Sequence, residues 1–202
     1  METVISKLEI KVKKAPKGTL FVLSDFTDLG SYESVKKAIQ KLVKNNNLIS
    51  LMLGIYKKPN YNNLLEQEIP SSPDEIAYAY ARKNNWNIAP SGDLALNKLG
   101  LSTQVPNIYQ YVSSGPSKKI MLENGHTVEF RHVAPKESVI APLSSLIIEA
   151  LKTIGKDNIT SDLLKSIIGR ISRQQFMQLK KDVVRARSWV RDAVFSMEGL
   201  ID

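Results

Sequence analysis

Ser91 and Gly92 are the residues that first suggest chemistry, and they open the stretch PSGDLALNKLGLSTQVP, Pro90 to Pro106. A serine beside a glycine on a tight turn is typical of a nucleophile or of a phosphate-binding helix start. The stretch lacks the flanking glycines of a nucleophile elbow, and it has no Gly-Lys-Ser/Thr of a phosphate-binding loop. We therefore expect Ser91 or Gly92 to cap a short helix that begins near Asp93.

His126 and His132 are the only two histidines, and they would lie on or beside one strand. Their spacing puts them on the same face, but about 20 Å of strand separates them, so one metal ion cannot bind both. No carboxylate pair is spaced to complete such a site. The sequence predicts no catalytic residue, no metal and no cofactor, and hence a protein that is not an enzyme.

The composition indicates a folded protein of the cytoplasm. The chain has 202 residues, 43% of them hydrophobic and 24% charged, which is ordinary for a globular protein. It contains no cysteine, no apolar run long enough to span a bilayer and no signal-peptide pattern, so we expect no membrane association. The net charge of +8, concentrated in the first and last thirds, favours a polyanionic partner.

Elements that would position such a partner are predicted in residues 1–60. Apolar residues of one buried helix face recur with helical spacing at Val35, Ala38, Ile39, Leu42 and Val43. The expected elements are a helix over Thr3–Lys13, a strand over Thr19–Val22, a short helix after Ser24, a longer helix after Ser31, and strands over Leu48–Leu51 and Ile55–Lys58. This order is that of a winged helix-turn-helix domain.

In that fold the longer helix enters the major groove of DNA and the wing lies along the phosphate backbone. The predicted DNA-binding residues are Ser31, Tyr32, Ser34, Lys36, Lys37, Gln40, Lys41, Lys44, Lys57 and Lys58. The alternative is a small helical domain with a solvated lysine face. Winged helices often act in pairs on inverted repeats, but the sequence shows no dimer seam.

The rest of the chain is predicted as a linker and two further segments. Residues 61–70 are a polar linker, 71–135 a small α+β domain with a helix on antiparallel strands, and 136–202 a C-terminal helical segment packed on it. The last predicted helix is the longest, from Gln174 to Met197. These helices would form a bundle or cap, or alternatively a basic face for RNA or an acidic partner. The fold class is therefore α+β.

Four motifs together resemble those of the AbiEi-type antitoxins: the lysine-bearing winged helix, GIYKKP at Gly54 to Pro59, EIA at Glu75 to Ala77, and the stretch from Pro90 to Pro106. That family comprises transcriptional regulators of bacterial abortive-infection, or type IV toxin–antitoxin, systems. The resemblance implies a winged helix that represses its own operon and a C-terminal part that counters a nucleotidyltransferase-like toxin. It covers residues 3–135.

Two functions follow as expectations. The first is an antitoxin and autorepressor that binds double-stranded operator DNA, with inverted repeats as the expected site. The second is a protein–protein interaction module that binds and inhibits the toxin directly, with DNA binding secondary. Its partner-binding residues would be Ser102, Thr103, Gln104, Lys181, Arg185, Arg187 and Arg191.

Overall fold

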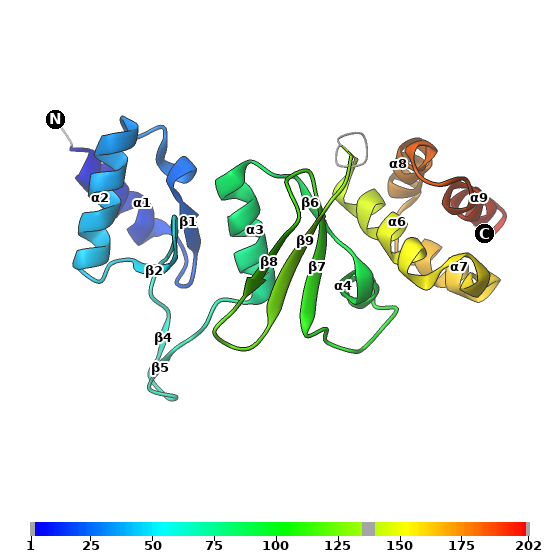
Figure 1. Cartoon of the computed structure of the whole chain (residues 1–202), viewed down its shortest axis with the longest axis horizontal. Coiled ribbons are helices and arrows are strands. Elements are labelled where there is room, and N and C mark those ends of the chain that lie inside the picture. Colours follow the sequence, from blue (N-terminus) through cyan, green and yellow to red (C-terminus); the bar gives the residue numbers. More distant parts are fainter. Residues whose placement is uncertain (1–2, 135–139, 201–202) are drawn as a thin grey trace. The chain divides into compact units, whose positions relative to one another are not determined.

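The computed structural model describes residues 3–134 and 140–200 and has mixed α and β structure (Figure 1). Contacts divide the chain into two compact units, an N-terminal unit of residues 1–86 and a C-terminal unit of residues 87–202. The predicted boundary between residues 135 and 136 lies outside the described residues. Among the described helices, none is long and apolar enough to cross a membrane.

The described residues of the N-terminal unit form three α-helices, a two-stranded hairpin and a three-stranded antiparallel sheet with strand order β1-β3-β2. Its elements are α1 (Val4–Lys14), β1 (Leu20–Val22), the 3₁₀ helix η1 (Leu23–Phe26), α2 (Tyr32–Lys44), β2 (Ile49–Met52), β3 (Ile55–Lys57), β4 (Tyr61–Asn62), β5 (Gln67–Glu68) and α3 (Pro73–Asn84). The predicted order of the first six elements agrees with these bounds to within a few residues.

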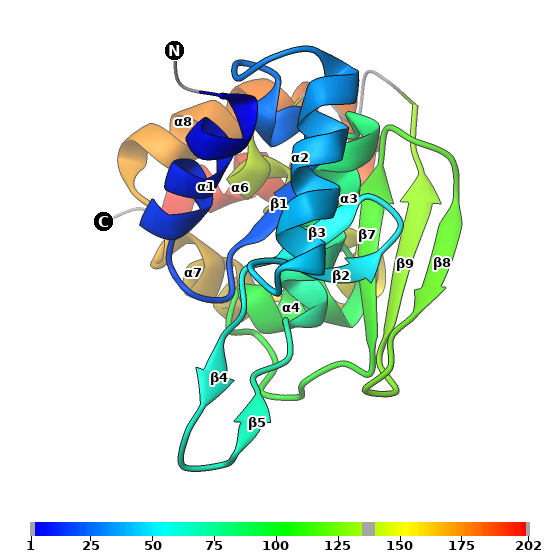
Figure 2. The ribbon, with the colours of Figure 1, turned by 90° about the vertical axis from the view of Figure 1, so that its left-hand side faces the viewer.

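The core of this unit forms because α1 and α2 each bury one apolar stripe against the other (Figure 2). Each helix begins at a hydroxyl cap, Thr3 for α1 and Ser31 for α2. The buried side chains from both helices, β1, η1 and the start of β2 are Leu8, Val12, Phe21, Phe26, Val35, Ala38, Ile39, Leu42 and Leu48. Together they hold α2 by its apolar face and leave its polar face outward.

Residues predicted as a linker form a small hairpin, β4–β5, which extends away from the three-stranded sheet (Figure 2). After it, α3 begins at a capping box formed by Ser72 and Glu75. Contacts place α3 with the N-terminal unit, whereas the sequence assigned it to a domain of residues 71–135. The Arg82 guanidinium donates to the Leu20 carbonyl at 2.9 Å, which ties α3 to β1.

The C-terminal unit combines a four-stranded sheet with helices (Figure 1). Its elements are β6 (Ile88–Pro90), α4 (Gly92–Lys98), β7 (Ile108–Ser113), β8 (Lys118–Met121), β9 (Thr127–His132), α6 (Pro142–Ile154), η2 (Lys156–Asn158), α7 (Ser161–Ile168), α8 (Arg173–Asp182), η3 (Val183–Arg185), α9 (Ser188–Ser196) and η4 (Met197–Leu200).

The sheet corrects the prediction of antiparallel strands throughout, because β7 and β9 pair in parallel. The strand order is β6-β7-β9-β8, so β9 lies between β7 and β8. Burial explains the order: β9 contributes the buried Val128 and Phe130, whereas β8 carries the exposed Lys118 and Lys119. The lysine-bearing strand takes the edge, where charge discourages pairing with another chain.

The predicted helix from Gln174 to Met197 is also wrong, because the chain leaves helical geometry between α8 and α9. Ala186 is extended, with φ −83° and ψ 176°. Val183, Val190 and Val194 are all fully buried in one cluster with α6 and α7 residues. A straight helix would carry its distal valines away from this core, so packing overrides a sequence that holds no glycine or proline at the break.

Candidate nucleic-acid interface

The outward face of α2 is the most concentrated set of uncompensated charge in the N-terminal unit. Its four lysines are all exposed, and within the described part of the chain none of them forms an ion pair: Lys36, Lys37, Lys41 and Lys44. Gln40 lies on the same exposed face. Glu33, in the first turn, is the one acidic residue of the helix. The face is therefore strongly cationic.

The first turn of α2 presents polar and aromatic groups beside these lysines. Ser31 is the N-cap, and its hydroxyl accepts a hydrogen bond from the Ser34 amide at 3.4 Å and lies 2.9 Å from the Ser34 hydroxyl. Tyr32 is 60% exposed, and the Lys36 ammonium lies over its ring at 5.9 Å from the centroid. An aromatic ring, two hydroxyls and a cation are thus held together at one helix end.

The structure removes Lys57 from this surface. Its side chain is 2% exposed, and its ammonium contacts the Glu68 carboxylate at 2.8 Å and donates to the Ile69 carbonyl. Lys57 follows the strand's alternation, with Ile55 and Lys57 inward and Tyr56 between them. Partial burial works to raise the pKa of the Glu68 carboxyl, but hydrogen bonds from Lys57 and the Asn60 amide, with the Lys57 charge, lower it overall.

Lys58 is also engaged within the protein. Its ammonium donates to the carbonyls of Lys13 and Ala15, at 2.8 and 2.6 Å, near the C-terminal end of α1. A cation at a helix C-terminus is stabilised by the unpaired carbonyls there. Both wing lysines are thus bound within the protein, whereas among the described residues the lysines of α2 contact no hydrogen-bond acceptor. The lysines of α2 therefore form the candidate interface.

Ser91 takes the N-cap position of α4, as predicted, but its hydroxyl makes no capping hydrogen bond. The predicted partner-binding loop follows this helix: Ser102 is partly buried, while Thr103 and Gln104 are exposed. Asn97 holds the loop, since its amide donates to the carbonyls of Ser102 and Gln104 at 3.4 and 2.9 Å.

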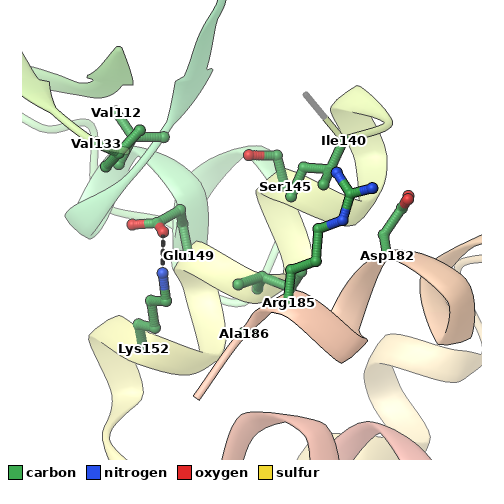
Figure 3. Close-up of a pocket in the computed structure, with 10 residues that line it drawn as sticks. Val112, Val133, Ile140, Ser145, Glu149, Lys152, Asp182, Arg185 and Ala186 are labelled. Carbon is green, nitrogen blue, oxygen red and sulfur yellow. Dashed lines mark hydrogen bonds and ion pairs between the residues drawn. The ribbon is translucent and has the colours of Figure 1, made fainter. Parts of the chain in front are cut away.

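The basic residues predicted for partner binding do not share one helix. Lys181 lies in α8, Arg185 in η3 and Arg191 in α9, with Arg187 at the start of α9; all four are exposed. Arg185 lines a small pocket, where it extends toward the space between Ser145, Ile140 and Asp182 (Figure 3). The helix break therefore distributes over three elements the four basic residues that the sequence predicted on a single helix.

The two histidines stay apart. The His132 ring nitrogen Nδ1 lies 2.9 Å from the Gly115 carbonyl, and the His126 ring packs edge-on against Tyr109 at 5.6 Å. Across the described residues, no group of three or more histidine, cysteine, aspartate or glutamate side chains is placed to hold a metal.

Glu149 is the charged residue that the sequence did not single out. It lies in α6 and is 5% exposed, and its carboxylate contacts Lys152 at 2.8 Å and Arg131 at 3.1 Å. Figure 3 shows the Lys152 contact beside the small pocket. Glu149 is four residues after Ser145 and three before Lys152, so all three lie on one helix face. This spacing is the feature of the sequence that could have pointed to Glu149.

These features define a class of protein: a mixed α+β chain with a cationic helix face and a C-terminal helical region. Residues 7–179 match the model of a family of unknown function, DUF6088, and the chain belongs to that family. No curated protein matches it significantly. Among solved structures it is similar to the RV2827C protein of Mycobacterium tuberculosis, with a TM-score of 0.46 and 13% identity over 98% of this chain and 76% of that chain.

Proposed function

We propose that the N-terminal unit is a winged helix-turn-helix domain that binds double-stranded DNA through α2. The observation that carries this is the exposed face of four lysines without ion pairs on a helix whose opposite face is buried against α1. The strand order β1-β3-β2 and the placement of α2 before the β2–β3 hairpin support it. A helix of 13 residues spans about 20 Å, enough to cross a major groove.

In this proposal the two ends of α2 have different roles. The lysines contact phosphates, which supplies affinity and salt dependence but no sequence information. The first turn, with Ser31, Tyr32 and Ser34, faces base edges, because recognition helices use their N-terminal residues for this. Hydroxyls bond to several base edges and an aromatic ring contacts a thymine methyl, so specificity resides in this turn.

The resemblance to AbiEi-type antitoxins extends the proposal to the protein's role in the cell. The protein would repress its own operon and counter a nucleotidyltransferase-like toxin encoded beside it, acting by binding rather than by catalysis. We test this with duplexes of the chain's own upstream region and shuffled duplexes of equal composition, in a mobility-shift assay at fixed salt. Preferential binding of the upstream duplex supports operator recognition; equal affinity for both contradicts it.

A second candidate is direct binding of the toxin by the C-terminal unit. Its helices expose apolar side chains at Met177, Val184 and Phe195, in the same segment as the exposed Arg187 and Arg191. Aromatic, methionine and arginine residues are enriched at interfaces between proteins. Co-expression with the neighbouring gene's product distinguishes the two, since a complex that survives high salt supports direct binding and separate elution contradicts it.

A further inference from the structure

A polar pocket of about 240 Å³ lies within the C-terminal unit, between the sheet and helices α4 and α6. The side chains that matter for its chemistry are Ser91, Gln110, Glu129, Arg131, Glu149 and Lys152. Such a volume holds several water molecules or a small ligand, and polar linings of this kind do not stay empty. The pocket is separate from α2, which belongs to the N-terminal unit.

Two of the pocket's cations are fixed by one buried anion. The Glu149 carboxylate, with its side chain 7% exposed, contacts Lys152 through Oε1 and Arg131 through Oε2. Burying a carboxylate is costly unless charged partners compensate it, and here two do so. Arg131 is 60% exposed at its side chain and uses Nη2 for this contact. This contact places the guanidinium beside the pocket and leaves its other donors for a ligand.

Three other lining groups have no partner for their side chains within the described residues. Ser91 is 5% exposed, makes no capping hydrogen bond and lines the pocket. Gln110 and Glu129 pair across β7 and β9 and thus share a face of the sheet. Gln110 and Glu129 are half-buried, so their polar ends reach the pocket and can bind a ligand there.

The charge pattern identifies the ligand's chemistry. Glu129 and Arg131 lie two residues apart on the same face of β9, so their Cα atoms are about 6.5 Å apart. Among the described residues Glu129 forms no ion pair, although Lys119 of β8 lies opposite it in the sheet, and Arg131 offers a guanidinium that contacts Glu149. We propose that this pocket binds a small zwitterion of the α-amino acid class, its ammonium group at Glu129 and its carboxylate at Arg131.

The other polar groups complete this arrangement. The Ser91 hydroxyl and the Gln110 amide supply further donors and acceptors next to the two charged groups. An anionic ligand alone would bind Arg131, but the nearby Glu129 carboxylate would repel that anion. A cation alone would leave the guanidinium donors unused, and only a ligand with both charges matches both groups.

We test the site by titrating the full-length protein calorimetrically with each of the twenty standard L-amino acids. Any amino acid that binds is titrated again as its N-acetyl derivative, which lacks the ammonium group, and as its amide, which lacks the carboxylate. The expected result is saturable one-to-one binding of at least one amino acid and loss of about tenfold or more in affinity for both derivatives. No binding by any of the twenty overturns the proposal, as does an unchanged affinity for either derivative.

Variants place the binding in this pocket. Glu129→Gln and Arg131→Gln are each expected to weaken binding about tenfold or more, whereas Glu123→Gln and Arg173→Gln remove the same charges at exposed positions outside the pocket and leave it unchanged. Should either pocket variant fail to fold, Ser91→Ala tests the same pocket, because it removes a lining hydroxyl that makes no capping hydrogen bond. Equal affinities for pocket and control variants contradict the assignment. The proposed DNA binding depends on α2, so a failure of DNA binding can be distinguished from a failure of amino-acid binding in this pocket.

Discussion

The ammonium of Lys57 lies 2.8 Å from the Glu68 carboxylate, and this ion pair joins β3 to the base of the β4–β5 hairpin. The Lys57 side chain is 2% exposed and that of Glu68 is 33% exposed, so only the lysine is fully removed from water. Glu68 also accepts a hydrogen bond from the Asn60 amide at 2.7 Å. A residue from the predicted linker thus neutralises a charge inside the N-terminal unit.

Replacing Glu68 by Gln should destabilise the N-terminal unit, because it leaves the buried Lys57 ammonium without a countercharge. We expect a loss on the order of 2 kcal/mol in the free energy of unfolding, below the values for fully buried pairs because Glu68 is partly exposed. Urea denaturation measures it. Glu66→Gln, an exposed carboxylate in the same hairpin, is the control and should change little.

The same ion pair makes stability depend on acid. The pKa of Glu68 is lowered in the folded state, so its contribution is present above the ordinary glutamate pKa and is lost as pH falls through the folded pKa. We expect the difference in unfolding free energy between the wild type and Glu68→Gln to be largest near neutral pH and to shrink below about pH 4. A difference that stays constant down to pH 2 would contradict this.

Gly92→Ala should destabilise the C-terminal unit. Gly92 has φ +59°, a left-handed conformation that side chains disfavour, and a Cβ there would overlap the Gln110 side chain. We expect a loss of about 1–3 kcal/mol in thermal or urea unfolding, from backbone strain together with the clash. Gly125→Ala is informative beside it: Gly125 also has positive φ, +82°, but nothing lies within 4 Å of its Cβ position. A larger loss at Gly92 isolates the effect of Gln110.

How far the sequence predicted this molecule depended on whether the signal was local. The periodic apolar positions of α2 and its Ser31 cap depend on neighbouring residues, and that helix is present. The parallel pairing of β7 with β9 and the break near Ala186 depend on contacts distant in sequence. Such contacts have no local signature.

The same distinction holds for the sites. The exposed lysine face of α2 could be read from helical spacing, because the buried face fixes the opposite one. The burial of Lys57 could not, because its partner Glu68 approaches only when the hairpin folds. The pocket around Glu149 was missed for a similar reason, since Ser91, Arg131 and Glu149 come from three elements far apart in the sequence.

The salt dependence of DNA binding tests the central claim, that α2 is the surface that contacts DNA, most directly. The measurement compares wild type with Lys37→Ala/Lys41→Ala and with Lys7→Ala/Lys13→Ala, which removes two exposed lysines of α1 and the same total charge. The account predicts that the α2 variant weakens affinity and lowers the slope of log affinity against log salt by about two, roughly one per lost phosphate contact. The α1 variant should keep most of the wild-type slope. Equal slopes for the wild type and the α2 variant would contradict the account.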